Sequence, residues 1–171
     1  VDLRQEPLYQ NILAMLHRKG IDLFVSFGDR KGQVANHQKA IGMAKTEFIW
    51  RVDDDEVPEP DCLEILYDFI IRDKSVGAVA GLVIDPINMI TEPCKVSNVI
   101  NNIDSEPNVQ WFSPTSFESN EPIRVGHLYS SFLYRKSAAG HGYHQGLSPV
   151  GHREETMFTC EMSAAWGLYV L

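Results

Sequence analysis

Cysteine is scarce in this chain, and its spacing excludes two classes of protein. The sequence has three cysteines, Cys62, Cys94 and Cys160, with no CxxC pair among them. A disulfide framework needs an even set and a structural zinc site needs close pairs, so we expect neither. We expect reduced thiols in a cytosolic compartment. Cys62 and Cys160 lie in predicted helices, and we expect them to be small residues in or near the protein core. Of the six histidines only His141 and His144 are close in sequence, so we expect no histidine-based transition-metal site.

Long apolar runs and an excess of positive charge are also missing. No stretch approaches the roughly 18 apolar residues of a membrane-spanning helix. The first seven residues, VDLRQEP, lack the basic and then apolar start of a signal peptide. The net charge of −8 argues against broad binding to nucleic acid or anionic membranes, although it permits a local basic pocket for a nucleotide. We therefore expect a cytoplasmic protein. A position on the cytosolic face of a membrane, with peripheral association, is an alternative that these observations leave open.

The 171 residues fit a single domain in which helices and strands alternate. The segment 76–84 is almost wholly apolar, as in a strand covered on both faces. The alternation up to residue 84 predicts an α/β fold with a mostly parallel central sheet flanked by helices. Residues 85–122 show no such pattern. The predicted helices are 7–19, 33–45, 60–71 and 153–166, and the predicted strands are 22–27, 47–52, 76–84, 127–135 and 168–171.

The most acidic segment of the chain directly follows the strand predicted at 47–52. It consists of Asp53, Asp54, Asp55 and Glu56. Four adjacent carboxylates repel one another, so burying them together without a cation is costly. At the carboxyl end of a sheet strand, where open α/β folds bind ligands, they suit a hard divalent metal and the phosphates it carries. A solvated acidic turn is the alternative that the local sequence leaves equally open.

A second acidic site, Glu154-Glu155, opens the last predicted helix. The helix dipole alone favours acidic residues in a first turn, and for the pair taken by itself this is the preferred interpretation. The functional alternative is a general base. A glutamate that is partly desolvated beside a second carboxylate has its pKa raised toward a useful range.

Five features of the chain occur together in a fixed order. They are Asn36, the triplet Asp53–Asp55, the basic pair Arg135-Lys136, the turn Gly140-His141-Gly142-Tyr143 and the acidic pair Glu154-Glu155. In this order they resemble an inverting family 2 glycosyltransferase of the GT-A fold, in which Asn36 precedes the metal strand and the triplet is of the DxD type. The resemblance covers nearly the whole chain and implies a GT-A type, Rossmann-like sandwich and a role in polysaccharide biosynthesis. It also implies one domain over residues 1–171, with a nucleotide-binding half (1–84) and an acceptor-side half (85–171).

The resemblance implies transfer of a sugar from a nucleotide-sugar donor to an acceptor hydroxyl, with inversion. It gives Asp53 a contact with the nucleoside and a share in the metal site. It makes Asp55 the ligand of Mg²⁺ or Mn²⁺, which bridges the donor diphosphate. It makes Glu155, beside Glu154, the catalytic base. The further residues that it places near the nucleotide are Asp2, Arg30, Lys31 and Asn36.

The chain also departs from the family pattern. The acidic pair is Glu-Glu rather than Glu-Asp, the Asp common two residues after the base is Met157, and the basic residue one turn later is Glu161. The usual first strand and C-terminal segment are absent, so we expect a portion of a larger domain that is a poor catalyst alone. Trp111 and Phe112 are candidates for stacking on the acceptor, with core packing as the alternative.

Two other functions stay open. A sugar nucleotidyltransferase-like enzyme shares a related architecture and acidic metal residues, but it needs a Gly-rich, basic phosphate loop that this chain lacks. A non-catalytic nucleotide- or glycan-binding domain is the alternative from a different class. The donor sugar and the acceptor, whether glycan, lipid-linked or another hydroxyl compound, cannot be inferred from fold analogy. No nucleic-acid partner is expected.

Overall fold

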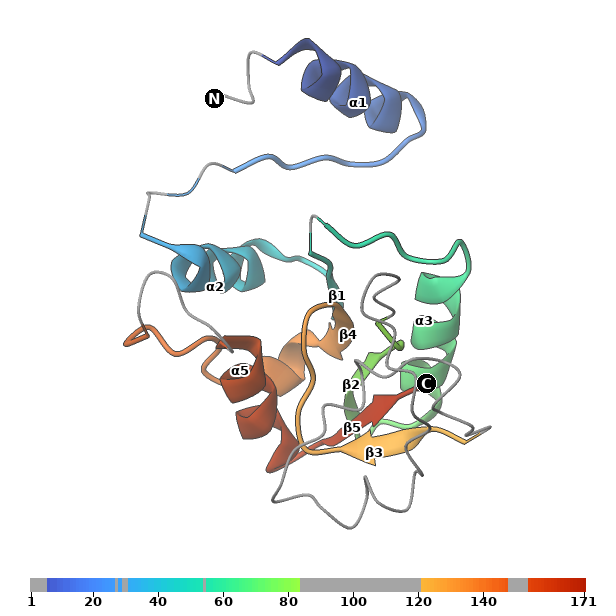
Figure 1. Ribbon diagram of the computed structural model, residues 1–171, viewed down its shortest axis with the longest axis vertical. Helices are drawn as coiled ribbons and strands as arrows, with labels where there is room; N and C mark the ends of the chain where they lie inside the picture. The colour runs from blue at the N-terminus through green and yellow to red at the C-terminus, as the bar shows by residue number, and fades with distance from the viewer. Residues whose placement is uncertain (1–5, 27, 29–30, 54, 84–120, 148–153) are drawn as a thin grey trace, which may run out of the picture. The chain divides into compact units, whose positions relative to one another are not determined.

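The structure, a computed structural model, describes residues 6–26, 28, 31–53, 55–83, 121–147 and 154–171. The chain divides into two compact units, residues 1–30 and residues 31–171 (Figure 1). None of the helices in the described parts is long and apolar enough to cross a membrane.

The first unit contains the helix α1 (Pro7–Arg18), as predicted. It begins with a proline, whose missing N–H costs nothing in a first turn, and ends with the basic residues His17 and Arg18. The strand predicted at 22–27 is not found over its described residues, 22–26, which are exposed and irregular. Apolar composition alone does not make a strand, because strand preference depends on packing against neighbouring residues.

The second unit is a mixed five-stranded sheet between helices. The predicted α/β class is confirmed, and most predicted elements are present at slightly shorter length. The strand predicted at 127–135 begins only at residue 132, and the short strand β3 was not predicted. In chain order the elements are α2 (Gln33–Met43), β1 (Phe48–Arg51), α3 (Cys62–Arg72), β2 (Val76–Ala80), β3 (Ile123–Val125), β4 (Phe132–Arg135), the 3-10 helix η4 (Lys136–Ala139), α5 (Glu154–Ser163) and β5 (Gly167–Val170).

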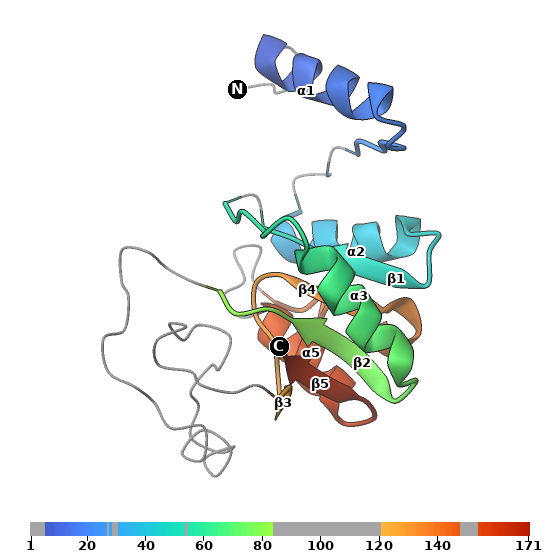
Figure 2. The same cartoon turned by 90° about the vertical axis from the view of Figure 1, so that its right-hand side faces the viewer.

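The strand order is β1-β4-β2-β5-β3, and the pairing is more mixed than predicted. Among the described neighbouring pairs, β2 and β5 are parallel. Figure 2 shows these two strands side by side. The other three pairs are antiparallel. Because β4 runs antiparallel to both β1 and β2, those two strands and β5 share one direction. The prediction of a mostly parallel sheet therefore holds for the direction of β1, β2 and β5. It does not hold for the neighbouring pairs, because most of them are antiparallel.

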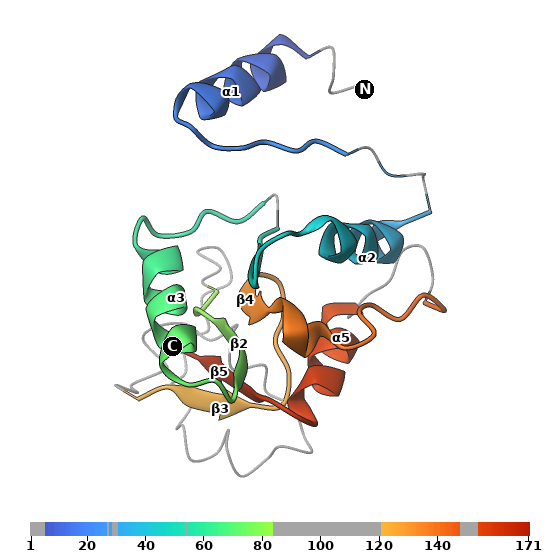
Figure 3. The same ribbon diagram turned by 180° about the vertical axis from the view of Figure 1, so that it is seen from behind.

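Helices cover both faces of the sheet, with α3 on one side and α2 and α5 on the other (Figures 1 and 3). Successive residues of a strand point to opposite faces, so each strand contributes to two cores. On β2, Val79 packs with Leu66 and Ile70 of α3. Ala78 and Ala80 pack in the larger core on the other side. This core also holds the aromatic side chains Phe132, Tyr134, Tyr143 and Phe158.

The two described cysteines differ in burial. Cys62 is partly buried and packs against the core beneath α3, as expected. Cys160 is exposed, so its predicted core position is wrong. The helix α5 buries Phe158, Thr159 and Met162, and the helical period of 3.6 residues turns position 160 away from that face.

Candidate functional site

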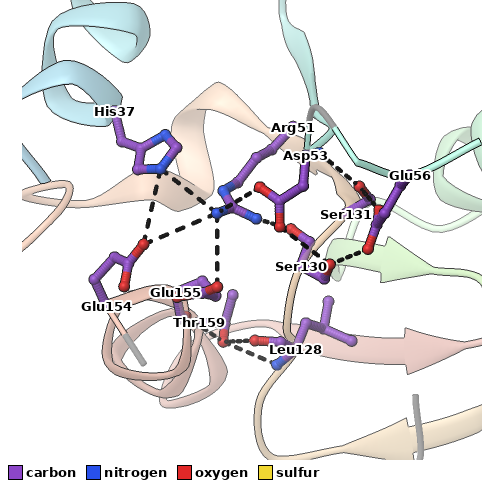
Figure 4. Close-up of polar contacts among 10 residues, drawn as sticks. All are labelled: His37, Arg51, Asp53, Glu56, Leu128, Ser130, Ser131, Glu154, Glu155 and Thr159. Atoms are coloured by element: carbon purple, nitrogen blue, oxygen red, sulfur yellow. Dashed lines mark hydrogen bonds and ion pairs between the residues drawn. The ribbon is translucent and has the colours of Figure 1, made fainter. Parts of the chain in front are cut away.

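The acidic turn lies at the carboxyl end of β1, beside the start of β4. The last residue of β1 pairs with the first residue of β4, so the residues just before β4 reach the turn. The Asp53 backbone N–H donates to Ser131 Oγ at 3.1 Å, and Ser130 Oγ donates to Asp53 Oδ2 at 3.1 Å. Both serine hydroxyls also donate to the Glu56 carboxylate (Figure 4). Two serines thus anchor the turn to the segment that leads into β4, and Glu56 is part of that anchor.

Ser130 has an unusual backbone conformation. Among the described residues other than glycine it alone has a positive φ, 54°. A residue with a Cβ adopts this left-handed conformation at a cost and keeps it only when surrounding contacts hold it. Here the carbonyl of Ser130 accepts a hydrogen bond from Arg51, while its hydroxyl contacts the acidic turn. In this conformation Ser130 contacts Arg51 through its carbonyl and Asp53 through its hydroxyl.

Arg51 lies at the centre of the site. Its side chain is only 6 % exposed, and its Nη2 atom lies 3.0 Å from Asp53 Oδ1. The same atom lies 3.9 Å from Glu154 Oε1 and 3.6 Å from Glu155 Oε1. The acidic turn and the acidic pair, far apart in sequence, therefore meet at one guanidinium (Figure 4).

The first turn of α5 is held in place from inside the fold. Thr159, on the next turn, is fully buried, and its Oγ1 accepts the N–H of Leu128 at 2.9 Å. Its hydroxyl also lies 2.8 Å from the carbonyl oxygen of Glu155. Because Leu128 belongs to the segment that leads into β4, the same segment fixes both the acidic turn and the helix that carries the acidic pair.

The two glutamates lie in different environments. The Glu154 side chain is 2 % exposed, whereas that of Glu155 is 14 % exposed. Burial raises the pKa of Glu154 to about 7, and the adjacent Glu155 carboxylate adds to the rise. Glu154 Oε1 and Glu155 Oε2 have no hydrogen-bond partner among the described residues. Buried polar atoms without partners are uncommon, so these two oxygens are an unusual feature of the site.

His37 on α2 completes the cluster. Its Nε2 lies 3.5 Å from Arg51 Nη2 and 3.8 Å from Glu154 Oε1. Its ring stacks on Tyr143 with centroids 5.0 Å apart. Burial and then the Arg51 charge lower the pKa of His37 below its ordinary value of 6.5, so the imidazole is mostly neutral at pH 7.

The sequence did not lead us to Arg51 or His37. An arginine within the apolar strand 48–52 was a visible signal, because a charge inside a buried strand needs partners. His37 lies three residues after Val34 and four before Ile41, the buried positions of α2. It therefore shares their inward face, which the helical period could have indicated.

The remaining residues predicted for the nucleotide side have different outcomes. Asp55, on the turn, and Asn36, on α2, are both exposed. Lys31 is exposed at the start of the second unit. The other predicted or considered positions lie outside the described residues: Asp2, Arg30, Asp54, Trp111 and Phe112.

The predicted basic pair has structural contacts. Arg135 is buried and donates to the carbonyls of Ile70 and Val76 at 2.7 and 3.0 Å. Lys136 Nζ donates to the carbonyl of Ala44 at 2.6 Å. The pair therefore ties β4 and η4 to α3, β2 and the end of α2.

The predicted Gly/aromatic turn packs on α2. Gln38 Oε1 accepts the N–H of Tyr143 at 2.8 Å, and a Cβ at Gly142 would come within 2.0 Å of that same oxygen. Gly142 also has a φ of +80°, which favours glycine. Tyr143 stacks on Phe158 of α5 with centroids 4.4 Å apart. The turn thus joins α2 to α5 next to the site.

The donor atoms of the turn fit a hard divalent cation that is shared with phosphates. Within the described ranges, no three His, Cys, Asp or Glu side chains form a group able to hold a metal ion alone. Mg²⁺ on a nucleotide uses one or two carboxylates together with phosphate oxygens, so a complete protein cage is not needed. A carboxylate has about four lone-pair sites that can accept hydrogen bonds or bind a metal. In Asp53 one site on Oδ1 faces Arg51 and one on Oδ2 faces Ser130, so the remaining sites can bind a cation. Asp55, two residues further along the turn, is exposed.

Comparisons with known proteins bear on the family and the fold of the chain. The model of "Glycosyl transferase family 2" matches residues 8–138, more than half of the chain. The comparison with curated proteins finds no match. Among solved structures, the crystal structure of TarS 1–349 from S. aureus is similar with a TM-score of 0.62 at 15 % identity. The similarity covers 97 % of this chain and 45 % of that one, so the chain spans less than half of TarS 1–349. This likeness supports the GT-A type fold predicted from the sequence.

Proposed function

Because the chain belongs to glycosyl transferase family 2, we propose that it transfers a sugar from a nucleotide-sugar donor to an acceptor hydroxyl, with inversion and with a divalent cation. One observation carries the proposal. Asp53 of the turn and Glu155 of α5 both lie within 4 Å of the same guanidinium nitrogen. Donor-side and acceptor-side carboxylates are thereby close enough to act on one substrate pair.

The acidic turn is the donor side in this proposal. Asp53 and Asp55 would hold Mg²⁺ or Mn²⁺, with Asp53 also facing the nucleoside. When bound, the cation supplies Lewis-acid stabilisation of the charge that develops on the departing nucleoside diphosphate. The exposure of Asp55 and the anchoring of Asp53 by Ser130 and Ser131 support this division of roles.

Glu155 is the base in this proposal. It removes the proton of the acceptor hydroxyl as the oxygen attacks the anomeric carbon, from the face opposite the leaving diphosphate. One C–O bond forms as another breaks, which gives inversion. The environment of Glu154 supports the choice: with a pKa of about 7 it carries a proton on a large fraction of molecules at neutral pH. Glu155 is the more accessible of the two side chains, at 14 % exposed against 2 %, so it is the one that a substrate hydroxyl can reach.

The test separates sugar transfer from donor binding in the full-length protein. Glu155→Gln keeps the shape of the side chain but removes the base, so transfer should fall by about 10²- to 10⁴-fold while calorimetric binding of a nucleoside diphosphate with Mn²⁺ is kept. Asp55→Asn should instead weaken the binding that depends on Mn²⁺. The donor is first selected by screening nucleotide sugars for binding and hydrolysis.

Two exposed carboxylates provide matched controls. Glu161 lies on the same helix as Glu155, and Glu59 lies on the loop that follows the acidic turn. The variants Glu161→Gln and Glu59→Gln should both leave transfer and binding unchanged. Near-normal transfer by Glu155→Gln would disprove the assignment of the base. Unchanged Mn²⁺-dependent binding by Asp55→Asn would disprove the assignment of the metal ligand.

A further inference from the structure

We propose that Arg51 is a positioning residue that sets the separation between the donor-binding turn and the acidic pair of α5. The inference rests on the proposed function, because it assigns these two groups to the donor and to the base. Arg51 acts through Asp53 and Glu155 and touches no reacting atom in this account.

The contacts of Arg51 define the position of its guanidinium from several sides. Nη1 donates to the carbonyl of Ser130, and Nη2 lies 3.0 Å from Asp53 Oδ1 and 3.6 Å from Glu155 Oε1. The guanidinium carbon also lies 5.9 Å from the centre of the Phe132 ring. A planar group held by a backbone carbonyl and an aromatic ring can fix two carboxylates at a set distance.

The charge balance shows why a cation is required at this position. Asp53, Glu154 and Glu155 all lie within 4 Å of Nη2, and carboxylates this close repel one another. A neutral residue in place of Arg51 would leave this repulsion uncompensated in a buried site, so the turn and the first turn of α5 would move apart. The reacting groups would then lose their alignment.

A lysine keeps the charge but cannot reproduce the geometry. Its ammonium is a single point of charge on a flexible stem, whereas the guanidinium carries separate nitrogens that here contact Ser130 and the carboxylates. We therefore expect Arg51→Lys to fold and bind the donor, yet to hold Glu155 in the wrong place for attack. A misplacement on the order of 1 Å costs about 10²-fold in rate.

The experiment measures kcat, donor KM and calorimetric binding of a nucleoside diphosphate with Mn²⁺ for Arg51→Lys in the full-length protein. We expect kcat to fall about 10²-fold, with binding changed by less than about threefold. Arg72→Lys, at an exposed arginine of α3 that is 75 % accessible, is the matched control and should match the wild type. A loss of binding with kcat unchanged would overturn the proposal.

A double-mutant cycle separates positioning from general destabilisation. If Arg51 acts through Glu155, then Arg51→Lys should lower the residual transfer of the Glu155→Gln protein only slightly. An equal fold-loss in both backgrounds would overturn the inference. If Glu155→Gln itself transfers sugar normally, the proposed function fails instead, so the two failures are distinct.

A second variant covers the case in which Arg51→Lys does not fold. His37→Gln removes the ring beside Arg51 Nη2 and leaves every carboxylate in place. It should lower kcat several-fold with binding kept, because the guanidinium loses one of the groups that confine it. Unchanged kcat in this variant would count against the positioning role.

Discussion

Folding changes the protonation of Glu154. It is buried against Arg51 and Glu155, and its pKa is raised from 4.5 to about 7, mainly by burial. Between these two pH values the folded protein binds more protons at this position than the unfolded chain does. The free energy of unfolding must therefore decrease as pH rises from about 4.5 to about 7. The stabilisation is fully present below the lower value and is lost above the higher one.

Glu154→Gln should remove this part of the pH dependence. The glutamine is neutral at every pH, so burial no longer opposes ionisation at this position. Urea unfolding between pH 5 and pH 8 should show a smaller decrease of the free energy of unfolding with pH than in the wild type. Glu161→Gln, on the exposed side of the same helix, should keep the wild-type slope. An unchanged slope in Glu154→Gln would show that another group titrates.

At the residue scale, the sequence predicted both acidic sites but not what joins them. The order of the motifs led to Asp53 and to Glu155. Arg51 connects them through contacts that depend on the register of β1 against β4 and on the position of α5. Neither can be derived from local patterns, because side chains from distant segments meet only in the folded chain. The contact of Glu56 with the two serines was missed for the same reason.

At the scale of elements, Arg135 joins β4 to the neighbouring parts of the fold. It donates to the carbonyls of Ile70 at the end of α3 and Val76 at the start of β2. It also pairs with Glu47, just before β1, at 2.7 Å. One buried side chain thus satisfies backbone groups that would otherwise lack partners where three elements meet.

Arg135→Met should destabilise the protein substantially. The methionine can fill part of the volume but leaves the two carbonyls without their donor, and each lost hydrogen bond to a charged group costs about 1.5–3 kcal/mol. We expect the free energy of unfolding to fall by about 3–6 kcal/mol, measured by urea unfolding.

Arg72→Met is the control for this change. Arg72 is exposed, and it forms an ion pair with Asp68 of its own helix at 3.9 Å. The control should change the free energy of unfolding by no more than about 0.5 kcal/mol. Equal effects of the two substitutions would contradict the role assigned to Arg135.

Elements with a strong periodic pattern were predicted well, and short ones were not. The buried strand β2 and the helices α2 and α3 follow from apolar spacing that burial requires. The strand β3 has three residues, too few for a pattern to stand out. The segment 22–26 has apolar residues typical of a strand, yet these residues are exposed and irregular. Strand formation therefore does not follow from composition alone.

At the scale of the whole molecule, the direction of β4 decides where the site forms. Because β4 is antiparallel to β1, its start lies beside the end of β1, and Ser130 and Ser131 reach the acidic turn. An alternating pattern of helices and strands favours parallel neighbours. The sequence therefore did not indicate that the antiparallel strand β4 lies between β1 and β2. The class of the fold could be predicted, but the pairing that assembles the site could not.

The central claim is that the acidic turn and the acidic pair form one glycosyl-transfer site. The most direct test is a crystal structure of the full-length protein with Mn²⁺ and a nucleotide sugar that the binding screen selects. We predict that the diphosphate and the cation lie at Asp53 and Asp55, with the sugar directed toward Glu155. A nucleotide bound elsewhere, for example in the pocket that Phe69 and Tyr169 line, would contradict the account.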